Sequence, residues 1–375
     1  MTPTTPAYSP GLEGVIAGET SISSVDESLR YRGYAIEDLA EHCVYEEVAY
    51  LLLYGELPTA KQLAGFNARI AAGRRLNQPL RDLFKGLPKW SQPLDVLRTA
   101  VSVISHFDQD VGDNSKESNL RKAERLIAQL PVAIADYFRY AKGLQPVAAS
   151  QELGTAANFL YMIRGEAPSE ADARCFDVSL ILYADHEFNA STFTARTIVS
   201  TQSDLHSAVI GAIGALKGPL HGGANEKVVG ILDQIGGREN AEKWVMDALA
   251  RKERIMGFGH RVCKKGDVRA GICKKFAAEA AARAGTQSYE ATAEIVETIM
   301  AAQKAMFPNV DWPAGRLYNS LGLEIPIYTP IFAMARVAGW SAHAIEQMEN
   351  NRLIRPRALY KGPADRVAKP MAERA

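Results

Sequence analysis

The chain has 375 residues, of which 47% are hydrophobic and 23% charged, and its 43 lysines and arginines balance its 43 aspartates and glutamates. This composition is typical of a soluble globular protein with enough length for one large domain or two modest ones. Because the formal net charge is zero, the protein lacks the broad positive field of a general nucleic-acid binder. A local cluster of arginines that binds a small anion is still compatible with this charge.

The four cysteines are Cys43, Cys175, Cys263 and Cys273. They form no CxxC pair and are too few for a disulfide framework, so they indicate a reducing compartment. The N-terminus has no basic segment followed by an apolar core, and the most apolar stretches are far shorter than the roughly 20 residues that cross a bilayer. We therefore expect a cytoplasmic protein that uses no membrane and no nucleic acid.

The first ten residues predict a loose arm, and the segments 15–16 and 21–24 predict a short β-hairpin. Helical periodicity dominates the rest, as in 93–107, where apolar residues recur at i, i+3 and i+7. Pro131 is expected to kink or restart the helix that contains it. The predicted helices span 36–42, 45–54, 60–72, 93–107, 120–140, 171–184, 191–201, 204–216, 225–235, 240–251, 289–306 and 330–349.

Strand signals after residue 35 are nearly absent. No alternation of strands and helices and no GxGxxG turn is present, which disfavours a dinucleotide-binding α/β fold. The sequence therefore predicts an all-α protein with at most a short N-terminal β-hairpin.

Two histidines lie in loops beside expected helix starts. His186 stands in ADHEFNAST, just before a helix that Asn189 or Ser191 caps, and on this segment alone a loop histidine bonded to backbone is the favoured interpretation. His221 stands in GPLHGGAN, where two glycines let backbone amides approach a ligand. The helix from Asn225 turns its positive end toward that point, as an anion requires, although a plain helix–helix turn is the simpler alternative.

The segment GFGHRVCKKGDVR combines glycines with a histidine and four cations. These ionisable residues are His260, Arg261, Lys264, Lys265 and Arg269. Flexible glycine with clustered cations suits a ligand that carries phosphate or carboxylate groups. The alternative is a solvated basic loop.

Asp311 stands between valine and tryptophan in FPNVDWPAG. Apolar surroundings raise the pKa of an aspartate from about 3.9 toward that of a useful general base. An Asx turn ahead of Pro313 is the structural alternative.

Arg336 lies in the apolar helix IFAMARVAGW and needs an anionic partner there, which is either a structural carboxylate such as Glu346 or a ligand. Three further arginines follow this helix. They are Arg352, Arg355 and Arg357.

Together these segments supply three loop histidines, one aspartate among apolar neighbours and several arginines, with no HExxH or other metal-ligand spacing. The set suits a small substrate with several carboxylates, activated by acid–base chemistry without a metal. Two other classes stay open, a zinc hydrolase and a catalytically inert helical binder. An inert protein is expected to have lost at least one of His221, His260 and Asp311.

Five motifs in fixed order resemble the citrate synthase family, and the resemblance covers nearly the whole chain. They are ADHEFNASTFTAR, GPLHGGANEKV, MGFGHRVCKKGDVRA, FPNVDWPAG and IFAMARVAGWSAHAIEQ. The resemblance implies a helical, two-domain homodimer, in some members a larger assembly of dimers, with the site in the cleft between domains. The large domain would comprise residues 1–221 and 317–375, and the small domain residues 222–316.

The resemblance also implies a reaction, the condensation of acetyl-CoA with oxaloacetate and water to citrate and CoA, the first step of the tricarboxylic acid cycle. Asp311 would remove the methyl proton, His221 would donate a hydrogen bond to the thioester oxygen, and His260 would polarise the oxaloacetate carbonyl. No cofactor is implied. The implied oxaloacetate ligands are His186, Arg269, Arg336 and, from the partner subunit, Arg355. The implied CoA contacts are Asn225, Lys264 and Lys265.

Three positions depart from the family pattern. Cys263 replaces a larger residue, Val268 replaces a proline before the carboxylate-binding arginine, and the sequence after Asp311 is Trp-Pro-Ala-Gly rather than Phe-Tyr-Ser-Gly. The last version resembles some 2-methylcitrate synthases, which use propionyl-CoA. One extra methylene changes binding by only about 1–3 kcal/mol. We therefore expect a citrate synthase, with 2-methylcitrate synthase as the alternative.

Overall fold

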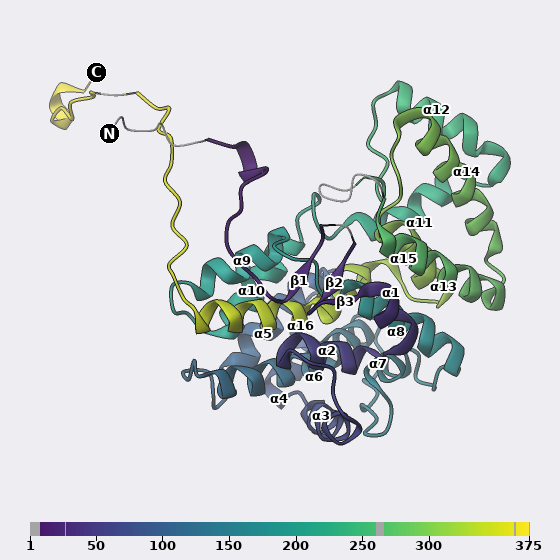
Figure 1. Ribbon diagram of the computed structural model, residues 1–375, viewed down its shortest axis with the longest axis horizontal. Helices are drawn as coiled ribbons and strands as arrows, with labels where there is room; N and C mark the ends of the chain where they lie inside the picture. The colour runs from purple at the N-terminus through teal and green to yellow at the C-terminus, as the bar shows by residue number, and fades with distance from the viewer. Residues whose placement is uncertain (1–7, 27, 260–265, 364, 375) are drawn as a thin grey trace.

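The computed structural model describes residues 8–26, 28–259, 266–363 and 365–374. Within these ranges the regular secondary structure is almost wholly helical, which confirms the all-α prediction (Figure 1). The α-helices are α1 (Ile36–His42), α2 (Tyr45–Tyr54), α3 (Ala60–Gly73), α4 (Gln78–Gly86), α5 (Pro93–Ser105), α6 (Lys116–Ala141), α7 (Thr155–Arg164), α8 (Glu170–Tyr183), α9 (Ala190–Val199), α10 (Leu205–Leu216), α11 (Ala224–Ile235), α12 (Ala241–Ala250), α13 (Val268–Ala284), α14 (Gln287–Lys304), α15 (Asp311–Ser320) and α16 (Tyr328–Glu349). Short 3-10 helices span Pro10–Leu12, Arg238–Asn240, Ile325–Ile327 and Met371–Glu373.

The N-terminal β-structure is a small antiparallel sheet of β1 (Ser23–Ser24), β2 (Arg30–Tyr31) and β3 (Tyr34–Ala35). The segment 21–24 enters this sheet as predicted. The predicted strand at 15–16 is wrong, because Val15 and Ile16 are exposed and lie in no strand. The other two strands of this sheet, β2 and β3, were not indicated by the sequence pattern.

Every predicted helix is present within a few residues of its expected ends, and four more were not predicted, α4, α7, α13 and α15. Helix α6 continues from Lys116 to Ala141 through Pro131, so the proline does not restart it. Asp311, expected in a loop, is the first residue of α15. Proline is tolerated at position 313 because backbone N–H groups in the first helical turn have no partner within the helix.

Helix α16 is the centre of the larger body. Its side chains are buried at nearly every position, as expected for a helix that is surrounded by others. Figure 1 shows α16 in the middle of this body, and it packs against α2, α6, α8, α9 and α10.

A second, smaller apolar core lies apart from the first. It is formed by α11, α12 and α14 together with Ile255, Phe258 and Trp312, and all its buried residues fall between positions 228 and 312. Helix α13 contributes Cys273 and Ala277 to the larger core instead. The division into residues 1–221 with 317–375 and residues 222–316 stays a prediction, and α13 and α15 are the elements that lie between the two cores.

Gly339 allows α16 to approach the loop between α8 and α9. A Cβ atom at this position would lie 2.4 Å from the carbonyl oxygen of Ala184 and 2.4 Å from Oδ1 of Asp185, which no real side chain tolerates. The loop that carries His186 therefore depends on a residue without a side chain here.

Gly339→Ala is expected to lower the free energy of unfolding by about 1–3 kcal/mol, because the added methyl group must push the loop off α16. Urea denaturation followed by circular dichroism measures this. The matched control is Gly271→Ala, at an exposed helical glycine where an added Cβ would meet no atom within 4 Å. There alanine is expected to stabilise the helix by roughly 0.5–1 kcal/mol. Equal effects of both substitutions would contradict the close approach.

No helix in the described part of the chain is long and apolar enough to cross a membrane.

Cys43, Cys175 and Cys273 are buried free thiols, and Cys263 lies outside the described residues.

Candidate active site

The predicted site residues His186, His221, Arg269, Asp311 and Arg336 converge near the C-terminal end of α8. Backbone carbonyls at that end accept hydrogen bonds from two of the arginines, and the last side chain of α8 contacts the aspartate. The ring of Phe332 joins further parts of the site. Its centroid lies 6.2 Å from that of His221, and the Arg336 guanidinium carbon lies 4.6 Å from it.

Asp311 is buried at the start of α15, where Oδ1 accepts a hydrogen bond of 2.6 Å from the hydroxyl of Tyr183. Burial raises the pKa of Asp311 to about 6, against the opposing effects of Tyr183 and Arg269. The Asx turn at this point is made by Asn309, whose Oδ1 accepts from the backbone N–H of Asp311. The apolar-flank interpretation of Asp311 is therefore confirmed and the Asx alternative is wrong.

The neighbours of His221 determine which of its two ring nitrogens carries the proton. Its Nε2 lies 3.3 Å from the backbone nitrogen and 2.8 Å from Oγ of Ser191. A backbone N–H only donates, so Nε2 is the acceptor and Nδ1 carries the proton. Burial and the nearby Arg336 lower the pKa of His221 to about 4. His221 is thus a neutral imidazole that offers one N–H as a donor.

Ser191 is itself held by two neighbours. The indole Nε1 of Trp340 donates to Oγ of Ser191 across 3.0 Å, and that oxygen lies 2.7 Å from Oδ1 of Asn189. Asn189 also caps α9, because its Oδ1 accepts from the backbone N–H of Thr192. The predicted helix cap is confirmed, and it is part of the support of His221.

Arg336 is buried and forms no ion pair with another described residue. Its Nε donates to the backbone carbonyl of Tyr183, and its guanidinium lies over the ring of Phe332. Burial lowers its pKa to about 10. Glu346 pairs with Arg196 at 2.7 Å instead, because ten helical residues place it about 15 Å along the axis from position 336. The prediction of Glu346 as a partner is wrong. The described carboxylate with the largest effect on Arg336 is Asp185, whose charge raises the pKa of this arginine without forming an ion pair with it.

Arg269 is buried at the start of α13 and pairs with both carboxylate oxygens of Asp267, at 2.9 Å from Nε and 2.8 Å from Nη2. Asp267 also accepts from the backbone N–H groups of Arg269 and Val310. The solvated-loop alternative is therefore wrong for Arg269. Val268 is the first residue of α13, and the ion pair with Asp267 holds the arginine that follows it.

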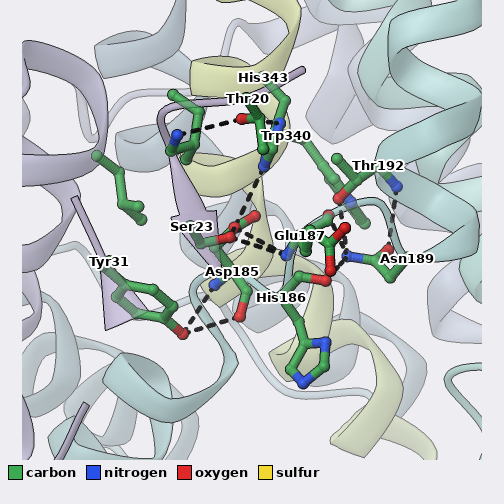
Figure 2. Close-up of polar contacts among 12 residues, drawn as sticks. Thr20, Ser23, Tyr31, Asp185, His186, Glu187, Asn189, Thr192, Trp340 and His343 are labelled. Carbon is green, nitrogen blue, oxygen red and sulfur yellow. Dashed lines mark hydrogen bonds and ion pairs between the residues drawn. The ribbon is translucent and has the colours of Figure 1, made fainter. Parts of the chain in front are cut away.

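The loop that carries His186 is held in place by the hydrogen bonds of the neighbouring residue, Asp185. Oδ2 of the fully buried Asp185 accepts from Oγ of Ser23 and lies 3.2 Å from Nε2 of His343. The Tyr31 hydroxyl accepts from the backbone N–H of Asp185 at 3.1 Å. Figure 2 shows the ring of His186 pointing away from this network. The network thus holds the backbone while the imidazole faces elsewhere.

The proton on His343 is determined in the same way. Nη1 of Arg196 lies 3.1 Å from Nδ1 of His343, and an arginine only donates. Nδ1 is therefore the acceptor, and Nε2 donates to Asp185. Sequence reasoning missed Tyr183, Asp267 and His343 as members of the site. The one available signal was spacing, since His343 lies seven residues after Arg336 and so on the same helix face.

Of the remaining predicted site residues, His260, Lys264 and Lys265 lie outside the described residues. Arg355 is exposed, and the backbone N–H before it, of Ile354, donates to Ser200 at the far end of α9 from His221. A ten-residue helix is about 15 Å long, so within one chain Arg355 is distant from the other site residues.

Asn225, a predicted CoA contact, is fully buried in the first turn of α11. Among the described residues its side-chain oxygen and nitrogen have no hydrogen-bond partner. No group of three or more His, Cys, Asp or Glu side chains in the described ranges is placed to hold a metal ion.

Comparisons with known proteins agree with this geometry. Residues 11–357 match the model of the family "Citrate synthase, C-terminal domain". The chain is 48% identical to 2-methylcitrate synthase 1 of Corynebacterium glutamicum, over 97% of this chain and 98% of that one. It is 45% identical to citrate synthase 2 of Bacillus subtilis, over 97% and 99%.

Solved structures show the same likeness. Citrate synthase from Thermotoga maritima superimposes with a TM-score of 0.88 at 39% identity, over 97% of this chain and 99% of that one. Citrate synthase from Thermoplasma acidophilum, solved as a ternary complex with carboxymethyl coenzyme A and oxaloacetate, gives a TM-score of 0.93 at 34% identity, over 99% and 100%. Sequence and structure agree over nearly the whole chain, and the protein is therefore an enzyme of the citrate synthase family.

Proposed function

We propose that the protein condenses acetyl-CoA with oxaloacetate and water to give citrate and CoA. The observation that carries this is that a buried carboxylate, a neutral imidazole and a buried arginine without an ion-pair partner among the described residues meet around the rings of Tyr183 and Phe332. These groups are Asp311, His221 and Arg336. The reaction needs a base, an oxyanion donor and counter-charges for carboxylates. The proposal requires no cofactor, because the CoA thioester is a substrate.

Asp311 is the proposed base. A thioester α-proton is far less acidic than a carboxylic acid, so a carboxylate removes it efficiently only when its pKa is raised and the developing enolate is stabilised. The pKa of about 6 leaves Asp311 ionised at neutral pH yet more basic than an exposed aspartate. Its carboxylate is therefore suited to proton transfer.

His221 is the proposed donor to the thioester oxygen. Its Nε2 is engaged by Ser191, so Nδ1–H is the group that faces away from that contact. A neutral donor does not protonate the thioester in advance, and it strengthens its bond as negative charge develops on oxygen. One such donor typically contributes about 10²–10³-fold in rate.

The arginines differ in what they offer to oxaloacetate. Arg336 has no carboxylate partner among the described residues, so a substrate carboxylate is its natural counter-charge. Arg269 is already neutralised by Asp267 and is proposed as a secondary contact, together with His186. The roles of His260, of Lys264 and Lys265 toward CoA, and of Arg355 from a partner subunit of a homodimer follow from family membership and remain proposals. So does the location of the site between two domains.

The residues after Asp311 do not favour the propionyl-CoA alternative. The indole of Trp312 is buried in the smaller core, where it packs on Phe258 and donates to Glu297 across 3.0 Å. Ala314 is buried in the larger core. Two of the positions that resemble 2-methylcitrate synthases are therefore packing positions.

The test is release of CoA thiol from acetyl-CoA and from propionyl-CoA, each with and without oxaloacetate. We expect release only with both substrates present, and a higher kcat/KM for acetyl-CoA. A higher value for propionyl-CoA would move the protein to 2-methylcitrate synthesis. No release with either thioester would indicate an inert member of the fold.

A further inference from the structure

Tyr183, the last residue of α8, contacts two parts of the site at once. Its hydroxyl donates to Oδ1 of Asp311 across 2.6 Å, and its backbone carbonyl accepts from Nε of Arg336. Its ring is fully buried and lies 4.2 Å from the ring of Phe332, centroid to centroid. One rigidly packed residue therefore lies between the proposed base and the proposed carboxylate ligand.

The two oxygens of Asp311 have different surroundings. Oδ1 accepts the hydroxyl of Tyr183, whereas Oδ2 accepts no hydrogen bond from any residue in the described ranges. The direction of the bond is fixed, because burial raises the pKa of Tyr183 well above its ordinary value and keeps the hydroxyl protonated. A carboxylate oxygen that already accepts a short hydrogen bond is a weaker proton acceptor than its free partner.

We propose that Tyr183 is a positioning residue that holds Oδ1 of Asp311, so that Oδ2 is the oxygen that takes the proton from the acyl-CoA substrate. This inference rests on the proposed function, in which Asp311 is the base. It adds a residue that the sequence motifs did not indicate and assigns the reaction to one carboxylate oxygen.

The contact has a second consequence, for the charge of the base. Among the groups that favour the ionised form of Asp311, Tyr183 has the largest effect on its pKa, ahead of Arg269 and Arg336. Arg269 lowers the pKa of Asp311, and its ion-pair partner Asp267 opposes this effect by raising it. The titratable and charged groups around Asp311 come from every element packed against it. They are Tyr183 of α8, Asp267 at the N-cap of α13, Arg269 and Cys273 of α13, Tyr318 of α15 and Arg336 of α16.

Tyr183→Phe removes this hydrogen bond from the charged form of Asp311, so the pKa of the base rises and the carboxylate becomes protonated at a higher pH. Bonds to charged groups correspond to a shift of about one to two pH units. The kcat/KM for thiol release is measured from pH 5 to pH 9, because kcat/KM reports the pKa of the base in the free enzyme. We expect its acidic limb to move up from near pH 6 by that amount, with most of kcat/KM recovered at pH 9.

The matched control is Tyr318→Phe. Tyr318 is fully buried on the same helix as Asp311, but its hydroxyl contacts Oγ of Ser179 at 3.2 Å. Loss of a buried hydroxyl lowers thermal stability in both variants, whereas only Tyr183→Phe is expected to move the acidic limb. Acid-induced unfolding would move the limb in both variants, so a shift confined to Tyr183→Phe reports the pKa of the base.

A second variant is expected to shift the acidic limb in the opposite direction. Placing 3,5-difluorotyrosine at position 183 makes the hydroxyl a stronger donor with little change of shape, and the acidic limb is expected to move to lower pH. Unchanged limbs in both variants would overturn the role of Tyr183. The proposed function fails separately, if the unaltered enzyme releases no thiol or if Asp311→Asn retains full kcat.

Discussion

Asp311→Asn is expected to lower kcat for thiol release by about 10²–10⁴-fold, the usual contribution of a positioned general base. The amide keeps the shape of the side chain, and its oxygen still accepts the hydroxyl of Tyr183. Oxaloacetate is therefore expected to bind as before. Initial rates give kcat, and isothermal titration calorimetry with oxaloacetate gives the affinity.

The same chemical change at Asp38, an exposed residue in α1, is the control and is expected to leave kcat unchanged. Thermal unfolding separates the two possible origins of a loss. A fall in kcat with an unchanged Tm supports the base, whereas equal losses of activity and Tm indicate a structural carboxylate. Full activity of Asp311→Asn would refute its assignment.

Two inactive variants are expected to restore each other in a mixed dimer. Arg355→Ala and Asp311→Asn should each be nearly inactive as homodimers, if Arg355 completes the site of the partner subunit. In the mixed dimer, the chain with intact Asp311 receives the intact Arg355, so one site is complete. Co-refolding equal amounts makes half of the dimers mixed, and activity is expected to approach about a quarter of that of the unaltered enzyme under two-fold symmetry.

The structure supplies a negative control for this experiment. Asp311 and Arg336 are both joined to Tyr183 of their own chain. A mixed dimer of Asp311→Asn with Arg336→Ala therefore carries one lesion in each site and should recover nothing. If verified Arg355→Ala and Asp311→Asn heterodimers also stay inactive, Arg355 serves its own subunit or no site.

The ends of helices are the part of the fold that the sequence predicted best. The predicted bounds of α1 and α2 are those of the structure, and Gly55 marks the end of α2 locally. Helix α15 was missed because Trp-Pro-Ala-Gly is typical of a loop. Gly315 is instead needed for packing, since a Cβ there would lie 2.7 Å from the backbone oxygen of Asn225. Helix α13 was missed because it faces two bodies and shows no single apolar stripe.

The clearest signals of the site came from residues whose chemistry conflicts with their local surroundings. Asp311 beside apolar residues and Arg336 in an apolar helix gave such a signal. Tyr183 did not, because a tyrosine at the end of an apolar helix is ordinary and its partner Asp311 is 128 positions away in the sequence. Glu346 was named for Arg336 because it is near in sequence, whereas helical rise separates the two. Pairings across the fold are set by packing, which a single sequence does not reveal.

The burial of α16 has a consequence for synthesis of the protein. This central helix is translated after all the helices that it packs against, from α2 to α11. At about 5–20 residues per second, the interval from the end of α10 to the end of α16 lasts roughly 7 to 27 s. During that time the nascent chain exposes the apolar groove that α16 later fills, a surface that chaperones recognise. Arg336 arrives on the same helix, so this arginine reaches the site only when α16 closes the core.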